Sequence, residues 1–135
     1  MPETSQLQAA LAEYFAPWVQ ALGLRVQSSE ASAVILRLPQ NPELSRVGGM
    51  LCGQAMMAAA DTAMVLALIQ HFGEFRPCTT VQMNSSFLKP LSNQDALVEA
   101  RVLRAGKSLA FGEIDIRGAD DGKSVSRAAT TYALL

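Results

Sequence analysis

Apolar positions along the chain follow three patterns in succession. Between residues 7 and 22 they recur every three or four positions, which predicts an amphipathic N-terminal helix. Between residues 54 and 70 almost every position is apolar, which predicts a helix that is buried on all of its faces. From residue 78 onward apolar and polar positions alternate, which predicts strands with two different faces.

The N-terminal amphipathic segment contains a proline. Thr4 or Ser5 is expected to cap the helix, and Gly23 is expected to end it. Pro17 lies inside the pattern, and proline removes a backbone N–H and clashes with the preceding helical turn. We therefore expect the helix to break or kink near Ala16.

Strands are predicted on both sides of the apolar helix. Two precede it and four follow it, over residues 24–29, 33–39, 78–88, 96–104, 108–117 and 124–134. In the first strand after the helix, alternation divides the side chains into one face with Val81, Met83 and Phe87 and another with Thr80, Gln82, Asn84 and Ser86. This order predicts an α+β fold, in one domain over residues 1–135, with an antiparallel sheet wrapped around the apolar helix.

One formally charged side chain, Asp61, occurs in the apolar helix. No other Asp, Glu, Lys or Arg lies between Arg46 and Glu74. Because an isolated charge is costly to bury, Asp61 is either satisfied by neighbouring amides or hydroxyls, or a reactive carboxylate in an apolar site. The apolar run is interrupted and shorter than the roughly 20 residues that a membrane span needs. We therefore expect a buried helix and no membrane partner.

A glycine-rich segment, residues 48–54, leads into the apolar helix. The first amides of a helix have no internal partner, and the helix dipole favours negative charge there. An amide near Gly53 could therefore hold a carbonyl oxygen whose charge grows during a reaction. A flexible lead-in with an ordinary cap is the alternative interpretation of these glycines.

Spacing along the helix limits how Gly53 and Asp61 can cooperate. They are eight residues apart, which corresponds to about 12 Å along a helix. One small carbonyl cannot contact both groups on a single chain. If two chains pair about a two-fold axis with these helices antiparallel, Asp61 of one chain approaches Gly53 of the other.

Composition changes this picture little. The formal net charge is −1 and there is no basic cluster, so we expect no nucleic-acid partner. The two cysteines, Cys52 and Cys78, fit neither a metal pattern nor a disulfide framework. The N-terminus has no basic segment followed by an apolar one, so we expect no signal peptide and a cytoplasmic location.

Four sequence features occur together in a familiar order. They are the glycine-rich turn, the helix segment 60–63 (Ala-Asp-Thr-Ala), the strand end 87–90 (Phe-Leu-Lys-Pro) and the segment 100–111. From about Asn41 to the C-terminus the chain thereby resembles the hot-dog-fold thioesterases of the phenylacetate-pathway (PaaI-like) group. The resemblance implies a long helix in a curved antiparallel sheet, a homodimer that often pairs into a homotetramer, and an acyl-coenzyme A substrate. It implies no cofactor and no metal, since coenzyme A is part of the substrate.

Residue by residue, the resemblance implies a role for several positions. Asp61 is the general base or nucleophile that acts on the thioester, and the backbone amide of Gly53 polarises the thioester carbonyl. Thr80 supplies a hydroxyl that helps to place the acid or its water. Four residues are expected near the coenzyme A nucleotide: Arg104, Gly106, Lys107 and Ser108. Arg and Lys suit phosphate, although a solvated hairpin has the same composition.

The chain departs from the family pattern at the start of the helix. Arg46 stands where the family has asparagine (Ser45 with a one-residue slip), Cys52 replaces its histidine, and Gln54 replaces its second glycine. We expect these three positions to line the substrate site. Loss of one donor to a developing oxyanion can cost about 10²–10³ in rate, so altered activity is an expected consequence.

Three functions compete on these features. An acyl-coenzyme A thioesterase is the leading hypothesis. A hot-dog dehydratase or hydratase generally uses a catalytic histidine, and the one histidine, His71, lies near the far end of the helix, where we expect a surface role. A non-catalytic acyl-thioester-binding protein is the alternative that the changes at Arg46, Cys52 and Gln54 favour. Covalent catalysis by Cys52 is also conceivable, because a helix N-terminus can lower the pKa of a thiol, but no histidine is nearby in sequence to act as its base.

Overall fold

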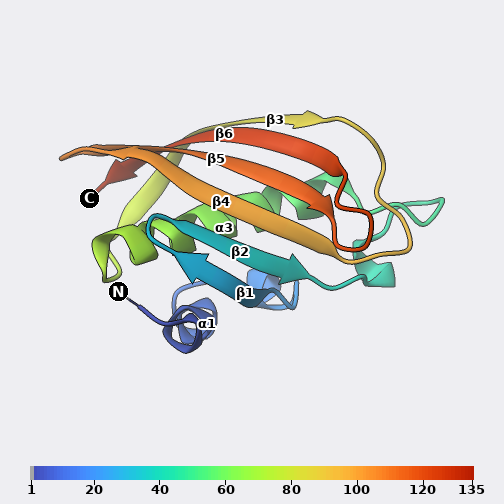
Figure 1. The fold of residues 1–135 in the computed structure, drawn as a ribbon, viewed down its shortest axis with the longest axis horizontal. Helices are drawn as coiled ribbons and strands as arrows, with labels where there is room; N and C mark the ends of the chain where they lie inside the picture. Colours follow the sequence, from blue (N-terminus) through green and yellow to red (C-terminus); the bar gives the residue numbers. More distant parts are fainter. Residues whose placement is uncertain (1) are drawn as a thin grey trace.

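The apolar segment forms helix α3, Gly53–Phe72, which lies along one face of a curved six-stranded sheet (Figure 1). The computed structural model describes residues 2–135. In chain order its other elements are α1 Thr4–Glu13, α2 Pro17–Gln20, β1 Arg25–Glu30, β2 Ala33–Leu38, the short 3-10 helix η1 Pro42–Leu44, β3 Cys78–Phe87, β4 Ala96–Ala105, β5 Leu109–Gly118 and β6 Ser124–Leu134. All neighbouring strands are antiparallel, in the order β1-β2-β4-β5-β6-β3. The predicted α+β architecture is confirmed.

Helix α3 is the centre of the hydrophobic core. Alanines such as Ala59, Ala63 and Ala67 are completely buried, and their small side chains let the sheet approach the helix closely. At Gly112 on β5 a Cβ atom would overlap the end of the Met64 side chain, so the missing side chain at this position makes room for that methionine. The prediction that the apolar run is too short and too interrupted to span a membrane is wrong, because α3 is continuous and long enough by length and composition. In this fold, however, 67% of its most apolar window is buried inside the protein, as expected of a core helix.

Two helices replace the single N-terminal helix that the pattern predicts. Helix α1 ends at Glu13 and α2 begins at Pro17, so the expected break near the proline is confirmed. The expected cap at Thr4 or Ser5 is wrong. Glu3 occupies the cap position, and its backbone N–H donates to Oε1 of Gln6 at 2.8 Å, which satisfies an amide that the helix itself leaves free.

A β-bulge interrupts the alternation of β3. Thr80 is paired with Tyr132 and Gln82 with Thr131 on β6, so Val81 is an extra residue without a partner in the ladder. The predicted placement of Thr80 and Gln82 on one face is therefore wrong, because the bulge turns them to opposite faces. The six predicted strands are otherwise present, with ends that differ by at most one residue.

Strand β3 is also an edge of the sheet. It pairs with β6 on one side only, and most of its side chains are exposed. Such an edge presents unpaired backbone N–H and C=O groups to any incoming strand. Strand β1 forms the opposite edge.

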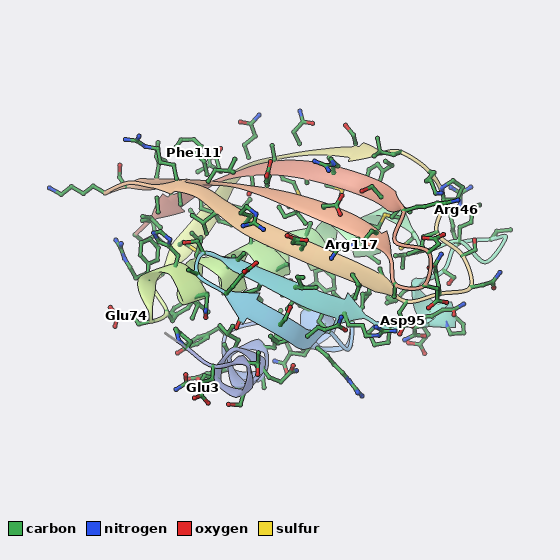
Figure 2. The ribbon with its side chains drawn as sticks, viewed as in Figure 1. Glu3, Arg46, Glu74, Asp95, Phe111 and Arg117 are labelled. Carbon is green, nitrogen blue, oxygen red and sulfur yellow. The ribbon has the colours of Figure 1, made fainter. Side chains whose placement is uncertain are left out.

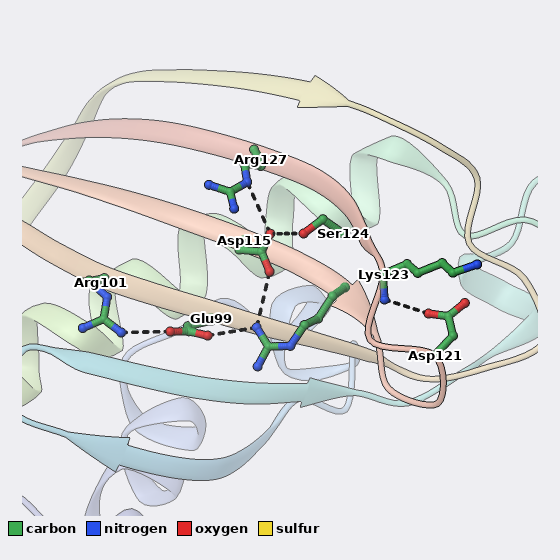
Figure 3. A network of polar contacts seen from close by, with 8 residues as sticks. Glu99, Arg101, Asp115, Asp121, Lys123, Ser124 and Arg127 are labelled. Carbon is green, nitrogen blue, oxygen red and sulfur yellow. Dashed lines mark hydrogen bonds and ion pairs between the residues drawn. The ribbon is translucent and has the colours of Figure 1, made fainter.

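An ion-pair network covers part of the sheet face that points away from α3 (Figure 3). Glu99 on β4 accepts from Arg101 at 3.0 Å and from Arg117 at 2.9 Å. Asp115 on β5 pairs with Arg117 at 3.3 Å and with Arg127 at 3.5 Å. Burial alone would raise the pKa of Glu99, but the hydrogen bonds from Arg117 and Arg101 lower it overall. The network ties β4, β5 and β6 together across a polar surface.

Candidate active site

Asp61 lies in the middle of α3, beneath strands β3 and β6. The hydroxyl of Thr80 donates to Oδ1 of Asp61 at 2.9 Å, and the hydroxyl of Tyr132 donates to the same oxygen at 2.5 Å. The bulge at Val81 is what aims Thr80 at the helix. Within residues 2–135 no hydrogen bond reaches Oδ2, so the carboxylate has one satisfied and one free oxygen. The predicted association of Asp61 with Thr80 is thus present in the structure.

Tyr132 is a member of this site that the sequence did not single out. Its side chain is 1% exposed, and a buried phenol requires a hydrogen-bond partner. Burial, followed by the negative charge of Asp61, raises the pKa of Tyr132, so the hydroxyl remains a protonated donor. The available signal was the one tyrosine on the predicted C-terminal strand, but its partner depends on the register between β3 and β6.

Cys78 lies close to the same carboxylate. Burial raises the pKa of its thiol, and the charge of Asp61 raises it further. The thiol is consequently neutral near pH 7 and a poor nucleophile. Within residues 2–135 no three His, Cys, Asp or Glu side chains are arranged to hold a metal ion.

Gly53 is the first residue of α3 and borders a surface hollow of about 580 Å³. The hollow has mostly apolar walls and two cationic side chains, and its lining comprises Arg46, Met50, Leu51, Gly53, Met56, Phe87, Leu88, Lys89 and Pro90. A Cβ atom at Gly53 would lie 3.4 Å from the Phe87 ring, so the ring packs directly against the glycine. The structure thereby brings two predicted site residues, Gly53 and Arg46, to one concave surface.

The other departures from the family pattern flank Gly53. Cys52 is the N-cap residue of α3, but its side chain makes no capping hydrogen bond, and Gln54 is exposed. His71 is exposed at the opposite end of α3, where its Nδ1 atom is 2.7 Å from the hydroxyl of Ser32. Cys52 and His71 are separated by about 28 Å along the helix, so His71 cannot act as a base for Cys52 of the same chain.

The segment Arg104–Ser108 comprises the end of β4 and the turn that connects β4 to β5, and it lies far from Gly53 of the same chain. Met50, just before α3, bridges to Ser92 near the start of β4, whereas Arg104 lies at the end of that strand. Ten strand residues span about 30 Å. Figure 2 shows Arg46 at one end of the molecule and Glu74, just beyond the C-terminus of α3, at the other. A single chain therefore does not bring these residues to the Gly53 hollow.

A curved antiparallel sheet that encloses one long helix defines the hot-dog fold, and in this chain an acid lies in the middle of that helix. The chain belongs to the thioesterase superfamily, since the model of that family matches residues 48–125. The matched region includes Gly53, Asp61, Thr80 and the turn 104–108.

Known proteins with related sequences and structures are consistent with this assignment. A Saccharolobus solfataricus protein, provisionally named as an esterase, is 28% identical over 84% of this chain and 80% of its own length. Human acyl-coenzyme A thioesterase 13 is 27% identical over 79% of this chain and 76% of its own length. The crystal structure of zebrafish thioesterase superfamily member 2 covers both chains completely, with a TM-score of 0.89 and 21% identity. Thioester hydrolysis is the general activity that this family membership supports.

Proposed function

We propose that the chain hydrolyses an acyl-coenzyme A thioester to the free acid and coenzyme A. The observation that carries the proposal is the carboxylate of Asp61, hydrogen-bonded at Oδ1 and free at Oδ2, in a member of the thioesterase superfamily. The name of the human relative, an acyl-coenzyme A thioesterase, favours coenzyme A as the carrier of the acyl group. The motifs of residues 60–63 and 87–90 favour a PaaI-like member, and we place it in the cytoplasm.

The proposed reaction begins with water held by Asp61. The carboxylate takes a proton from the water, and the water oxygen bonds to the thioester carbon. The amide of Gly53 donates to the carbonyl oxygen as it becomes negative, which can be worth about 10²–10³ in rate. The carbon–sulfur bond then breaks, and the coenzyme A thiolate leaves and takes up a proton. Direct attack by the carboxylate, followed by hydrolysis of the anhydride, is the other route for the same residues.

We propose that each site is shared by two chains paired through their β3 edges. Thr80, which holds Asp61, lies near one end of β3, and Phe87, which packs on Gly53, is its last residue. In an antiparallel pair centred between Met83 and Asn84, Thr80 faces the partner subunit's Phe87. That register would bring Asp61 of one chain toward Gly53 of the other. Within one chain the two residues are too far apart along the helix to contact the same carbonyl.

The same pairing would place the β4–β5 turn near the substrate site of the partner chain. The turn is remote from Gly53 of its own chain but lies at the end of the molecule that an antiparallel partner brings toward the other chain's Gly53. Replacing Arg104 and Lys107 together with Ala should raise KM several-fold and change kcat little, because contacts with the phosphates of coenzyme A would be lost. The rise in KM should be larger at low salt, where these contacts are screened least. Steady-state kinetics at two ionic strengths measures this. A variant with Ala at two other exposed cations, Arg25 and Lys123, is the matched control. An unchanged KM in the Arg104 and Lys107 variant would show that these two residues do not bind the substrate.

Cys52 is not expected to be the nucleophile. Cys52→Ser should retain activity within about a factor of ten, because the Gly53 amide survives and no histidine lies within reach as a base. Mass spectrometry after rapid mixing with substrate would detect an acyl group on the protein. An acylated Cys52 in the wild type, together with an inactive Ser variant, would contradict this.

A thiol-release assay with aliphatic and aromatic acyl-coenzyme A esters tests the proposed function. Turnover that requires Asp61 would support hydrolysis. The changes at Arg46, Cys52 and Gln54 favour one alternative, a protein that binds acyl thioesters without cleaving them. Tight binding by calorimetry with no thiol release from any ester would establish that alternative and contradict the proposal.

A further inference from the structure

The hydroxyl groups around Asp61 are distributed unequally between its two oxygens. Oδ1 accepts from Thr80 and from Tyr132, while Oδ2 accepts from no group within residues 2–135. A carboxylate oxygen offers about two lone-pair positions, so two donors occupy Oδ1. The arrangement leaves Oδ2 as the only oxygen able to take a proton from water or to meet a carbonyl carbon.

The two donors differ in how firmly they are held. Tyr132 is 1% exposed, near the C-terminal end of β6, and its ring is part of the hydrophobic core. Thr80 is exposed on the edge strand β3. Because the core holds the Tyr132 ring, its hydroxyl fixes the position of the carboxylate more rigidly than the hydroxyl of a small side chain on an edge strand does.

We propose that Tyr132 is a positioning residue, which orients Asp61 through Oδ1 and thereby selects Oδ2 as the reactive oxygen. The inference rests on the proposed function and extends it to a side chain outside the family motifs discussed above. In this arrangement the water proton passes to Oδ2, the water oxygen bonds to the thioester carbon, and the thiolate departs. Tyr132 neither contacts the substrate nor transfers a proton.

The surroundings of Asp61 define which groups could interfere with its titration. From β3 the nearby groups are Thr80 and the thiol of Cys78, and from β6 the nearby group is Tyr132. The helix contributes no other formal charge between Gly53 and Phe72. Burial and the charge of Asp61 raise the pKa of both Cys78 and Tyr132, so both stay neutral near pH 7 and neither adds a charge beside the carboxylate.

Tyr132→Phe removes the hydroxyl and keeps the ring. With wild-type turnover as the reference, kcat should fall on the order of 10-fold with little change in KM, because one hydrogen bond to a charged group is lost. The acidic limb of the pH–rate profile should move up by roughly one pH unit, since hydrogen bonds to the charged form favour that form. Tyr14→Phe, at the exposed second tyrosine, should change neither quantity and is the matched control.

A titration independent of turnover separates this inference from the proposed function. Carbon-13 NMR of labelled aspartate, with the Asp61 signal identified by its loss in Asp61→Asn, should show the same upward shift in Tyr132→Phe. If the wild type hydrolyses no thioester but the titration shifts, the proposed function fails and the hydroxyl contact stands. If turnover is present while kcat, the pH profile and the titration are all unchanged in Tyr132→Phe, Tyr132 does not position Asp61.

Thr80 supplies a second test if Tyr132→Phe does not fold. Thr80→Val removes the other donor at an exposed position, and Thr80→Ser restores a hydroxyl. The Val variant should shift the titration in the same direction by a smaller amount, and the Ser variant should return it toward wild type. A Val variant that moves the titration by the roughly one pH unit expected for loss of Tyr132 would show that Thr80, not Tyr132, is the main donor to Oδ1, and would overturn the proposal.

Discussion

Asp61→Asn should abolish most thioester hydrolysis and leave the fold and oligomeric state intact. The amide oxygen of asparagine can still accept hydrogen bonds from Thr80 and Tyr132, so the helix keeps its contacts with β3 and β6. The side chain can no longer take a proton from water, and general base catalysis typically contributes about 10²–10⁴ in rate. The measurement is kcat by thiol release, with circular dichroism and gel filtration to monitor the fold and assembly.

Glu74→Gln is a suitable control for this substitution. It also neutralises one acid near α3, but at an exposed position beyond the C-terminus of the helix. Its activity should match that of the wild type. A folded Asp61→Asn variant with undiminished turnover would remove Asp61 from the mechanism.

Complementation between two inactive variants should restore activity if the site is shared. One chain carries Asp61→Asn, and the other carries Gly53→Pro. Proline is well tolerated at the first position of a helix, and Cys52 already has the extended backbone that precedes proline. The substitution therefore deletes the amide of Gly53 with little other disturbance. Gly53→Ala keeps the amide while adding a Cβ against Phe87, and is the matched control.

The expected recovery follows from random pairing. About half of the dimers in an equal mixture contain one chain of each kind, and each of these regains one intact site of two. Activity should therefore rise to roughly a quarter of wild type after co-refolding. Heterodimers that form, as shown by differently tagged chains, yet remain as inactive as either parent would rule out the shared site.

Local patterns in the sequence were sufficient to predict the principal elements. The apolar run of residues 54–70 predicted α3, Pro17 predicted the break between α1 and α2, and period-two alternation predicted the strands. Asp61 was identifiable because it is the one formal charge in an apolar helix. Its association with Thr80 was implied by the family resemblance and not by alternation, which put Thr80 on a face with Gln82.

The remaining features depend on contacts between distant segments. The bulge at Val81 is fixed by the register of β3 against β6, which no local pattern encodes. Tyr132 acquires its significance only through that register, because the pairing with Thr80 brings both hydroxyls to Asp61. The distance between the β4–β5 turn and Gly53 likewise depends on how the strands are ordered in the sheet.

The free edge of β3 links dimer formation to both the activity and the aggregation of the chain in solution. If two chains pair there, dilution below the dissociation constant would lower specific activity, since each separated subunit would carry half of two sites. The separated subunit would also expose the unpaired outer edge of the ten-residue strand β3, which is a template for strand addition by misfolded or foreign chains. The polar side chains along that edge, Gln82, Asn84 and Ser86, reduce this risk without removing it. Pairing with the correct partner would thus protect the protein from aggregation as well as complete its chemistry.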